Sequence, residues 1–226
     1  MSAYADLTAL AERARSGDFL VPRPAMWNTP MDRSQARPAA VLLLFGALDN
    51  VPAASANPLV SADLDVLLVE RAATLTDHPG QVAFPGGGVD AGDGSVLDAA
   101  LREAQEETGL DPSGVEILGV LPDVPLPVSN FIVTPVLGWW ARPTPVDVVD
   151  YGESAQVFRV PVRDLLDPAN RVMATLSRGG HTYRGPAFAV NGVVVWGFTA
   201  GILTHVFDQL GWSVPWDESR EITAPL

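Results

Sequence analysis

Three glutamates crowd one short segment of this chain, directly after a glycine-rich stretch. The segment reads Arg102-Glu103-Ala104-Gln105-Glu106-Glu107-Thr108-Gly109-Leu110. On a helix, residues three and four positions apart share a face, so Glu103, Glu106 and Glu107 would lie together. Like charges this close repel one another unless a cation lies among them. Hard divalent ions such as Mg²⁺ prefer oxygen ligands and often bridge to substrate phosphates. The segment therefore predicts a metal-dependent site for phosphate chemistry.

The glycine-rich stretch before this segment predicts a loop over residues 72–94. Its glycines are Gly80, Gly86, Gly87, Gly88, Gly92 and Gly94. A backbone without side chains can approach a ligand closely. We expect the helix itself over residues 95–108, with Ser95 as its N-cap and Gly109 just beyond its end. The glutamates would then face a loop that is suited to binding phosphate.

The glutamate segment resembles the second half of the Nudix box, G-x5-E-x7-R-E-U-x-E-E-x-G-U, in which U is aliphatic. The matching residues are Arg102, Glu103, Glu106, Glu107, Gly109 and Leu110. The first half of the box departs from the pattern. The box glutamate would stand at Gly94 when counted back from the arginine, and at Asp93 when counted forward from Gly87. One inserted loop residue reconciles the two counts and makes Asp93 a candidate additional acid.

The residues before the box resemble the coenzyme A pyrophosphatase branch of the Nudix family. That branch carries L-L-T-x-R-[SA]-x3-R-x3-G-x3-F-P-G-G. The matches are Leu67, Leu68, Arg71, Ala72, Gly80 and Phe84-Pro85-Gly86-Gly87. Val69 replaces the threonine and Thr76 replaces the second arginine. The second change removes a guanidinium that can bind a phosphate through two N–H groups.

The resemblance implies a fold and a division of the chain. Strands mixed with a few helices leave α/β and α+β open, and the family implies a mixed β-sheet sandwiched between α-helices. We expect an N-terminal helix and extended arm over 1–36, the Nudix hydrolase domain over 37–210 and a tail over 211–226. The arm and the tryptophans are compatible with a homodimer.

The resemblance also implies roles for individual residues. Glu103, Glu106 and Glu107 would hold Mg²⁺ or Mn²⁺, and the catalytic residues would be Glu103, Glu106 and Arg102. Which carboxylate acts as general base differs among Nudix enzymes and is left open. The candidate substrate-binding residues are Arg71, Gly86, Gly87, His78 and Gln81. Asp93 and Glu153 are candidate additional acids, whereas Gln156 occupies a position that is often acidic in the family and cannot act as a base.

The activity implied is cleavage of the pyrophosphate of coenzyme A or its derivatives to 3′,5′-ADP and 4′-phosphopantetheine. A first alternative is a pyrophosphatase for another nucleoside diphosphate derivative, such as ADP-ribose or NADH. A second alternative, of a different class, is a non-catalytic module that binds a nucleotide. The usual mark of such a module is loss of the box glutamates, which this chain retains.

Composition excludes several other classes of protein. The formal net charge of −13 would repel nucleic acid, which binds proteins mainly through Lys and Arg. The absence of cysteine excludes disulfides and thiolate catalysis. The longest apolar runs, such as residues 39–45, are too short to span a bilayer, and the N-terminus lacks a secretory signal. We expect a cytoplasmic protein that acts on a small-molecule nucleotide and binds neither nucleic acid nor membrane.

Hydrophobic periodicity predicts the remaining elements. Helices are expected over 4–16, 95–108 and 197–210. Strands are expected over 39–48, 65–71, 115–121, 131–141, 156–160, 171–176, 182–190 and 193–196. Asn191-Gly192 favours a type I′ hairpin turn between the last two strands. The tail after Gly211 is expected to be irregular.

Overall fold

The computed structural model describes residues 2–19, 31–48, 59–75, 79–127, 129–178 and 181–225. Three of the sequence predictions fall outside these ranges. They concern His78, Thr76 and most of the N-terminal arm. Among the described helices, none combines the length and the apolar character needed to cross a bilayer.

Within the described residues, eight strands form the larger of two sheets. The strands are β1 (Arg37–Ala47), β2 (Leu64–Arg71), β3 (Val82–Ala83), β4 (Gly86–Gly88), β5 (Val115–Val120), β6 (Val124–Leu126), β7 (Phe131–Trp140) and β8 (Ser154–Pro161). The central strands β1 and β7 run parallel over ten paired residues, and the other pairs in this sheet are antiparallel. The sheet is therefore mixed, as predicted.

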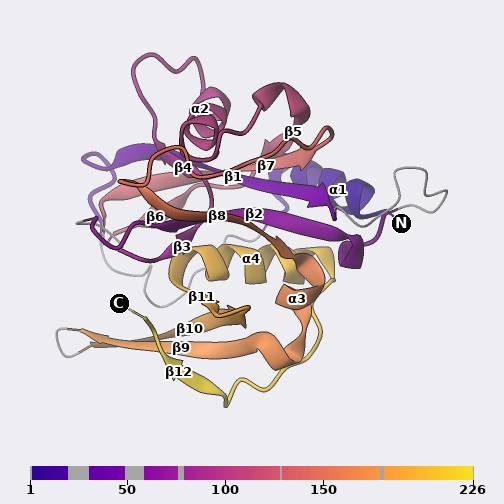
Figure 1. Cartoon of the computed structure of the whole chain (residues 1–226), viewed down its shortest axis with the longest axis vertical. Helices are drawn as coiled ribbons and strands as arrows, with labels where there is room; N and C mark the ends of the chain where they lie inside the picture. The colour runs from indigo at the N-terminus through magenta and orange to yellow at the C-terminus, as the bar shows by residue number, and fades with distance from the viewer. Residues whose placement is uncertain are drawn as a thin grey trace.

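Helices cover both faces of this sheet because side chains alternate along its strands (Figure 1). From β1, Leu42 and Leu44 pack against helix α2 (Val96–Thr108), whereas Leu43 and Phe45 belong to the core formed with helices α1 (Ala3–Arg15) and α4 (Gly197–Leu210). All four side chains are fully buried, and burying one such side chain contributes about 1.5 to 3 kcal/mol. The predicted architecture, a mixed sheet between helices, is confirmed.

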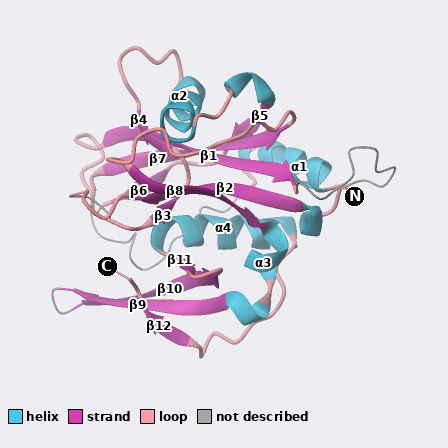
Figure 2. Cartoon of the chain, viewed as in Figure 1, coloured by secondary structure: helices cyan, strands magenta, loops and turns pink. Residues whose placement is uncertain are grey.

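A second sheet of four strands lies on the other side of α4 (Figure 2). Its strands are β9 (Arg171–Arg178), β10 (His181–Val190), β11 (Val193–Val195) and β12 (Glu221–Thr223), in the order β11-β10-β9-β12. The ring of Phe188 on β10 lies edge-on to Phe207 on α4, with centroids 6.4 Å apart. Because α4 contacts both sheets, it is buried on two sides. The prediction of an irregular tail is wrong at β12, which pairs in parallel with β9.

Most element boundaries follow the sequence patterns closely. The predicted helices coincide with α1, α2 and α4 to within one residue, and the predicted strands agree to within two. Asn191 and Gly192 both have positive φ angles, 51° and 84°, as the hairpin turn requires. Short elements complete the chain, namely α3 (Val162–Leu166) and the 3₁₀ turns η2 (Ser61–Asp63), η3 (Pro112–Gly114) and η4 (Pro168–Asn170).

The glycine-rich loop contains two short strands that the sequence did not predict. Strand β3 pairs with β2, and β4 pairs with β1, so the turn at Phe84 and Pro85 is inserted between β2 and β1. The Leu42 N–H donates to the Pro85 carbonyl at 2.8 Å. Gly86 has φ of 156°, and a Cβ added there would collide with the Ala40 carbonyl oxygen. The loop is therefore fixed to the central strand, directly beneath α2.

Candidate active site

Helix α2 lies close to the sheet because its inner face is made of small residues. Ala99, Ala100 and Ala104 are fully buried. Leu97 and Leu101 are partly buried against the same core. Ser95 caps the helix by accepting from the Asp98 N–H, and Gly109 ends it in the left-handed conformation with φ of 69°.

The three glutamates of α2 lie at different depths. Glu107 is buried, with 8% exposure. The side chain of Glu103 is 19% exposed and that of Glu106 is 58% exposed. Exposure thus increases from Glu107 through Glu103 to Glu106. The carboxylates of Glu107 and Glu103 lie against the glycine loop.

Glu107 is held by the backbone of that loop. The Gly86 N–H donates to Glu107 Oε2 at 3.0 Å. Burial penalises the charged carboxylate and raises the pKa of Glu107 to about 7, although the Gly86 hydrogen bond acts in the opposite direction. A carboxylate that is costly to charge at this depth favours a nearby cation.

Glu103 lies against Gly87. A Cβ added at Gly87 would lie 2.5 Å from the carboxylate carbon of Glu103, so any larger residue there would displace this carboxylate from its present position. Burial raises the pKa of Glu103, and the Arg102 guanidinium opposes that rise. The absence of a side chain at Gly87 thus makes room for the Glu103 carboxylate.

Every N–H group of the Arg102 guanidinium has a partner. Nη1 donates to Glu103 Oε1 and to Glu106 Oε2, each at 3.0 Å. Nε and Nη2 donate to the two oxygens of Asp93, and Nη2 also donates to the Gly88 carbonyl, all at 3.0 Å. Arg102 therefore connects the helix glutamates to the loop.

The carboxylate of Asp93 points at Arg102. Its side chain is 6% exposed, and the Arg102 hydrogen bonds hold its pKa below the usual range. The Asp90 N–H also donates to Asp93 Oδ2, at 2.8 Å. Asp93 thus reaches Arg102, although its side chain is shorter than the glutamate of the box and one residue is inserted in the loop. A Cβ added at the neighbouring Gly94 would lie 3.0 Å from Asp98 Oδ2.

A second group of predicted residues lies where β2, β3 and β8 meet. The Arg71 N–H donates to the Gln81 carbonyl at 3.0 Å, and the Ala72 N–H donates to the Glu153 carbonyl at 2.9 Å. Glu153 is exposed, and its charge raises the pKa of Glu107 whereas the charge of Arg71 lowers it. The structure therefore brings Arg71 and Glu153 beside the most deeply buried glutamate.

Two details of this region bear on binding. Nε of Arg71 is buried and lacks a hydrogen-bond partner within the described part of the chain. Gln156 pairs through its backbone with Glu70, and its side chain is exposed. A buried N–H without a partner costs free energy, so Arg71 is suited to bind an acceptor such as a phosphate oxygen.

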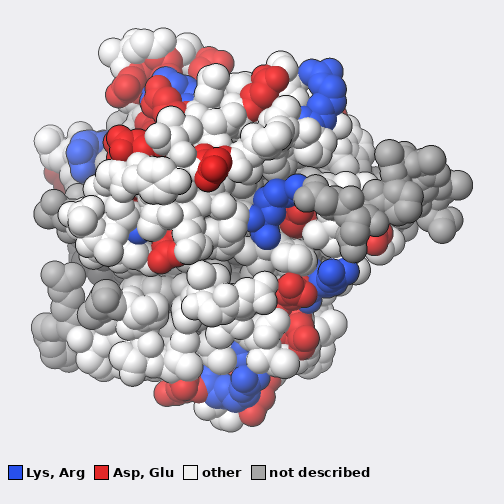
Figure 3. Space-filling view, viewed as in Figure 1, with Lys and Arg blue, Asp and Glu red and all other residues white. Residues whose placement is uncertain are grey.

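The donor set fits a hard divalent cation, although the carboxylates are not gathered at one point. In the described ranges, no group of three or more His, Asp or Glu side chains has the spacing of a preformed metal site. Arg102 holds Glu103 and Glu106, and Gly86 holds Glu107, each through one oxygen. Carboxylate oxygens are the ligands that Mg²⁺ and Mn²⁺ prefer. Figure 3 shows acidic side chains gathered around α2 with an arginine among them.

Sequence reasoning singled out Glu153 but not the rest of its loop, residues 147–152, which is a further neighbour of the site. The Asp147 N–H donates to the Thr108 carbonyl at 3.0 Å, so this loop lies against the C-terminal end of α2. Its tip carries Tyr151, a residue that is 72% exposed. The only signal in the sequence is a turn composition around Gly152.

Comparison with known proteins identifies the family. The model of the NUDIX domain matches residues 50–176. An uncharacterized Nudix hydrolase NudL of Enterobacter sp. (strain 638) is 39% identical over 197 residues, covering 85% of this chain and 91% of that protein. A relative of the same name from Cronobacter sakazakii is 42% identical over 146 residues, covering 65% of this chain and 75% of the relative.

A solved structure shows a weaker likeness. The MutT/nudix family protein from Enterococcus faecalis matches with a TM-score of 0.46 and 16% identity, over 93% of this chain and 75% of that protein. The family assignment rests instead on the domain match and on the identity to the two NudL relatives. This chain belongs to the Nudix family and is a hydrolase that acts on pyrophosphate bonds.

Proposed function

We propose that this hydrolase cleaves the pyrophosphate of coenzyme A or a derivative, releasing 3′,5′-ADP and 4′-phosphopantetheine. The branch pattern at residues 67–87 supports this substrate class. The observation that carries the proposal is the position of Arg71, the arginine that the branch pattern retains. It lies beside Glu107 with a buried Nε that lacks a partner in the described residues.

In this proposal, Glu103, Glu106 and Glu107 hold Mg²⁺ or Mn²⁺ through carboxylate oxygens. When bound, the cation supplies charge neutralisation at the transferred phosphoryl group and activation of the attacking water. Water adds to one phosphorus, the bridging P–O bond breaks, and the water proton passes to a carboxylate base. Arg71 binds a phosphate oxygen that is not transferred.

The protein contributes positioning as well as ligands. Arg102 orients Glu103 and Glu106, and the Gly86 N–H orients Glu107. The glycines at 86 and 87 keep the loop backbone close to the carboxylates, so the pyrophosphate can approach them. These contacts exist before a ligand binds, which reduces the reorganisation needed during the reaction.

One departure favours a second candidate function, cleavage of another nucleoside diphosphate derivative such as ADP-ribose or NADH. Thr76 stands where the branch pattern has its second arginine. That arginine would supply charge for an additional phosphate, and coenzyme A carries a 3′-phosphate that ADP-ribose lacks. The identity of the products separates the two candidates.

The test is mass spectrometry of products after incubation with MgCl₂ or MnCl₂. The panel holds coenzyme A, acetyl-coenzyme A, ADP-ribose, NADH and nucleoside triphosphates. We expect 3′,5′-ADP from coenzyme A, formed faster than any other product and abolished by EDTA. Faster cleavage of ADP-ribose or NADH would replace the first candidate with the second. Binding without cleavage of any nucleotide would favour a non-catalytic module.

The Glu103→Gln variant tests the site assignment. Glutamine keeps the shape of the side chain but cannot supply a charged oxygen, so we expect kcat to fall about 100-fold or more. Glu116→Gln is the matched control, because Glu116 lies on β5 and accepts from the Tyr4 hydroxyl. Unchanged turnover in Glu103→Gln would refute the proposed metal site.

A further inference from the structure

Tyr151 is an exposed aromatic residue beside the candidate active site. The residue is 72% exposed. The described tryptophans have packing partners instead: Trp140 and Trp196 are buried, Trp139 contacts Tyr4, Trp212 stacks on Phe207, and Trp216 lies against the Arg171 guanidinium. Tyr151 presents a free aromatic face.

The loop that carries Tyr151 is anchored on both sides. Before the tyrosine, the Val149 N–H donates to the Glu107 carbonyl at 3.5 Å. After it, the Gly152 N–H donates to Asp150 Oδ1 at 2.7 Å, and the Glu153 carbonyl accepts from Ala72. An exposed ring on an anchored loop loses little conformational entropy when a ligand covers it.

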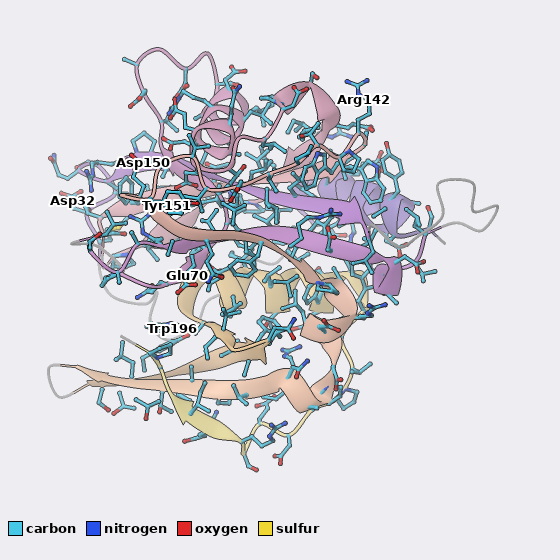
Figure 4. All side chains as sticks on the ribbon, in the orientation of Figure 1. Asp32, Glu70, Arg142, Asp150, Tyr151 and Trp196 are labelled. Carbon is cyan, nitrogen blue, oxygen red and sulfur yellow. The ribbon has the colours of Figure 1, made fainter. Side chains whose placement is uncertain are left out.

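The anchors also determine where the ring lies. Val149 is bonded to the backbone of Glu107, and Glu153 is bonded to the residue after Arg71. Tyr151 lies midway between these two contacts along the chain. Figure 4 shows Tyr151 next to Asp150, between α2 and β8. Tyr151 thus lies on a loop whose two ends are bonded to the backbone of Glu107 and of the residue after Arg71.

We propose that Tyr151 stacks on the nucleobase of the substrate and thereby selects nucleotide pyrophosphates. This inference rests on the proposed pyrophosphatase site, because the phosphates bound there place the ribose and base nearby. A base presents a flat π face that stacks on an aromatic side chain whatever its hydrogen-bonding pattern. The phenol hydroxyl is not needed for such a contact.

The contact has a kinetic signature. The base is remote from the reacting phosphorus, so stacking stabilises the bound substrate and the transition state equally. Loss of such uniform binding raises KM and leaves kcat unchanged. Removing a stacked side chain from a nucleotide site weakens binding about tenfold or more.

The experiment compares four variants with the wild type. Tyr151→Ala and Tyr151→Leu remove the aromatic ring, and Tyr151→Phe retains it. Val149→Ala is the control, because it shortens another exposed side chain of the same loop. Binding of AMP and of ribose 5-phosphate is measured by calorimetry in MgCl₂, together with KM and kcat for the substrate that the wild type cleaves.

We expect the Ala and Leu variants to bind AMP about tenfold more weakly and to raise KM by a similar factor. Their affinity for ribose 5-phosphate and their kcat should not change. The Phe and Val149→Ala variants should match the wild type. Unchanged AMP affinity in Tyr151→Ala, or an equal loss for ribose 5-phosphate, would overturn the proposal.

The outcomes also separate this inference from the proposed function. If the wild type cleaves a nucleotide pyrophosphate and Tyr151→Ala does so with the same KM, only the stacking role fails. If the wild type cleaves no member of the panel but binds AMP in a manner that depends on the ring at position 151, the hydrolytic proposal fails and the nucleotide contact stands.

Discussion

Two parallel hydrogen bonds join Arg102 to Asp93, from Nε to Oδ1 and from Nη2 to Oδ2, each 3.0 Å long. The remaining amino group of the same guanidinium holds Glu103 and Glu106. The loop carboxylate thus fixes the orientation of Arg102, and Arg102 fixes two of the glutamates. Asp93, which lies outside α2, therefore sets the orientation of side chains on α2.

Replacing Asp93 by Asn should lower kcat about tenfold or more, as expected when the residue that orients the proposed metal ligands loses its own partner. The amide offers one acceptor where two are needed, so Arg102 can rotate away from the glutamates. Asp90→Asn is the matched control, because Asp90 is 76% exposed and lies 3.8 Å from Arg102. Steady-state kinetics of both variants check the prediction, which fails if Asp90→Asn is as damaging as Asp93→Asn.

Replacing Gly87 by Ala should lower kcat by a similar factor. The added Cβ would lie 2.5 Å from the carboxylate carbon of Glu103 and would displace it. Gly88→Ala is the control, because a Cβ at Gly88 meets nothing within 4 Å. We expect wild-type kinetics and similar thermal stability in the control. Equal activity of the two variants would show that the Glu103 carboxylate need not lie against the loop.

Arg171→Ala should lower the free energy of unfolding by about 2 to 4 kcal/mol, as for other large side chains truncated in a core. Arg171 is 1% exposed, lies over the rings of Phe188 and Trp216, and donates to Thr204 on α4 at 3.3 Å. It therefore joins β9, α4 and the C-terminal segment.

Arg171→Met should lower the free energy of unfolding by less, below about 1.5 kcal/mol, because methionine fills most of the volume of the arginine side chain. Nε of Arg171 is buried without a hydrogen-bond partner in the described residues, so removing the charge also removes a desolvation penalty. Urea denaturation followed by circular dichroism measures both variants. A methionine variant as unstable as the alanine variant would mean that the charge itself stabilises the fold.

Stability should fall as the pH rises from about 10 to 12. Burial raises the pKa of Tyr183 to about 12, so the folded protein binds this proton more tightly than the unfolded chain, whose tyrosines titrate near pH 10. The contribution of Tyr183 to the free energy of unfolding is fully present below about pH 10 and is lost as the pH rises through about 12. Since Tyr183 is partly exposed, we expect a loss of about 1 to 2 kcal/mol.

This chain suits such a measurement because it has no lysine, and its basic residues are 14 arginines and 3 histidines. Thermal unfolding between pH 9 and 12 (about the range in which tyrosine titrates) compares the wild type with Tyr183→Phe. The variant should lose less stability, and the residual loss belongs to other groups such as Tyr4, whose pKa is raised by its hydrogen bond to Glu116. Parallel curves for the two proteins would contradict the prediction.

Local sequence signals predicted the local structure well. Ser95 and Gly109 mark the two ends of α2, and Asn191-Gly192 marks the hairpin turn between β10 and β11, because caps and turns depend on a few adjacent residues. The spacing of the glutamates placed them on one helix face. These predictions needed no knowledge of distant contacts.

Features that depend on distant residues could not be predicted. Strands β3, β4 and β12 are two or three residues long and exist only through their pairing with β2, β1 and β9. The bond between Asp93 and Arg102 depends on how the inserted loop residue is accommodated. The unequal burial of Glu103 and Glu107 depends on how α2 rotates on the sheet, and the position of Tyr151 depends on a contact between residues 149 and 107.

The inserted turn at Phe84 and Pro85 has a consequence for the smallest fragment that can function. The NUDIX domain match covers residues 50–176, yet the strand that anchors this turn, β1, ends at Ala47, and α4 begins at Gly197. A fragment cut to the matched range would lose the partner of Gly86 and the cover over one face of the sheet. Residues outside the matched range therefore supply the strand that positions the glycine loop and the helix that covers one face of the sheet.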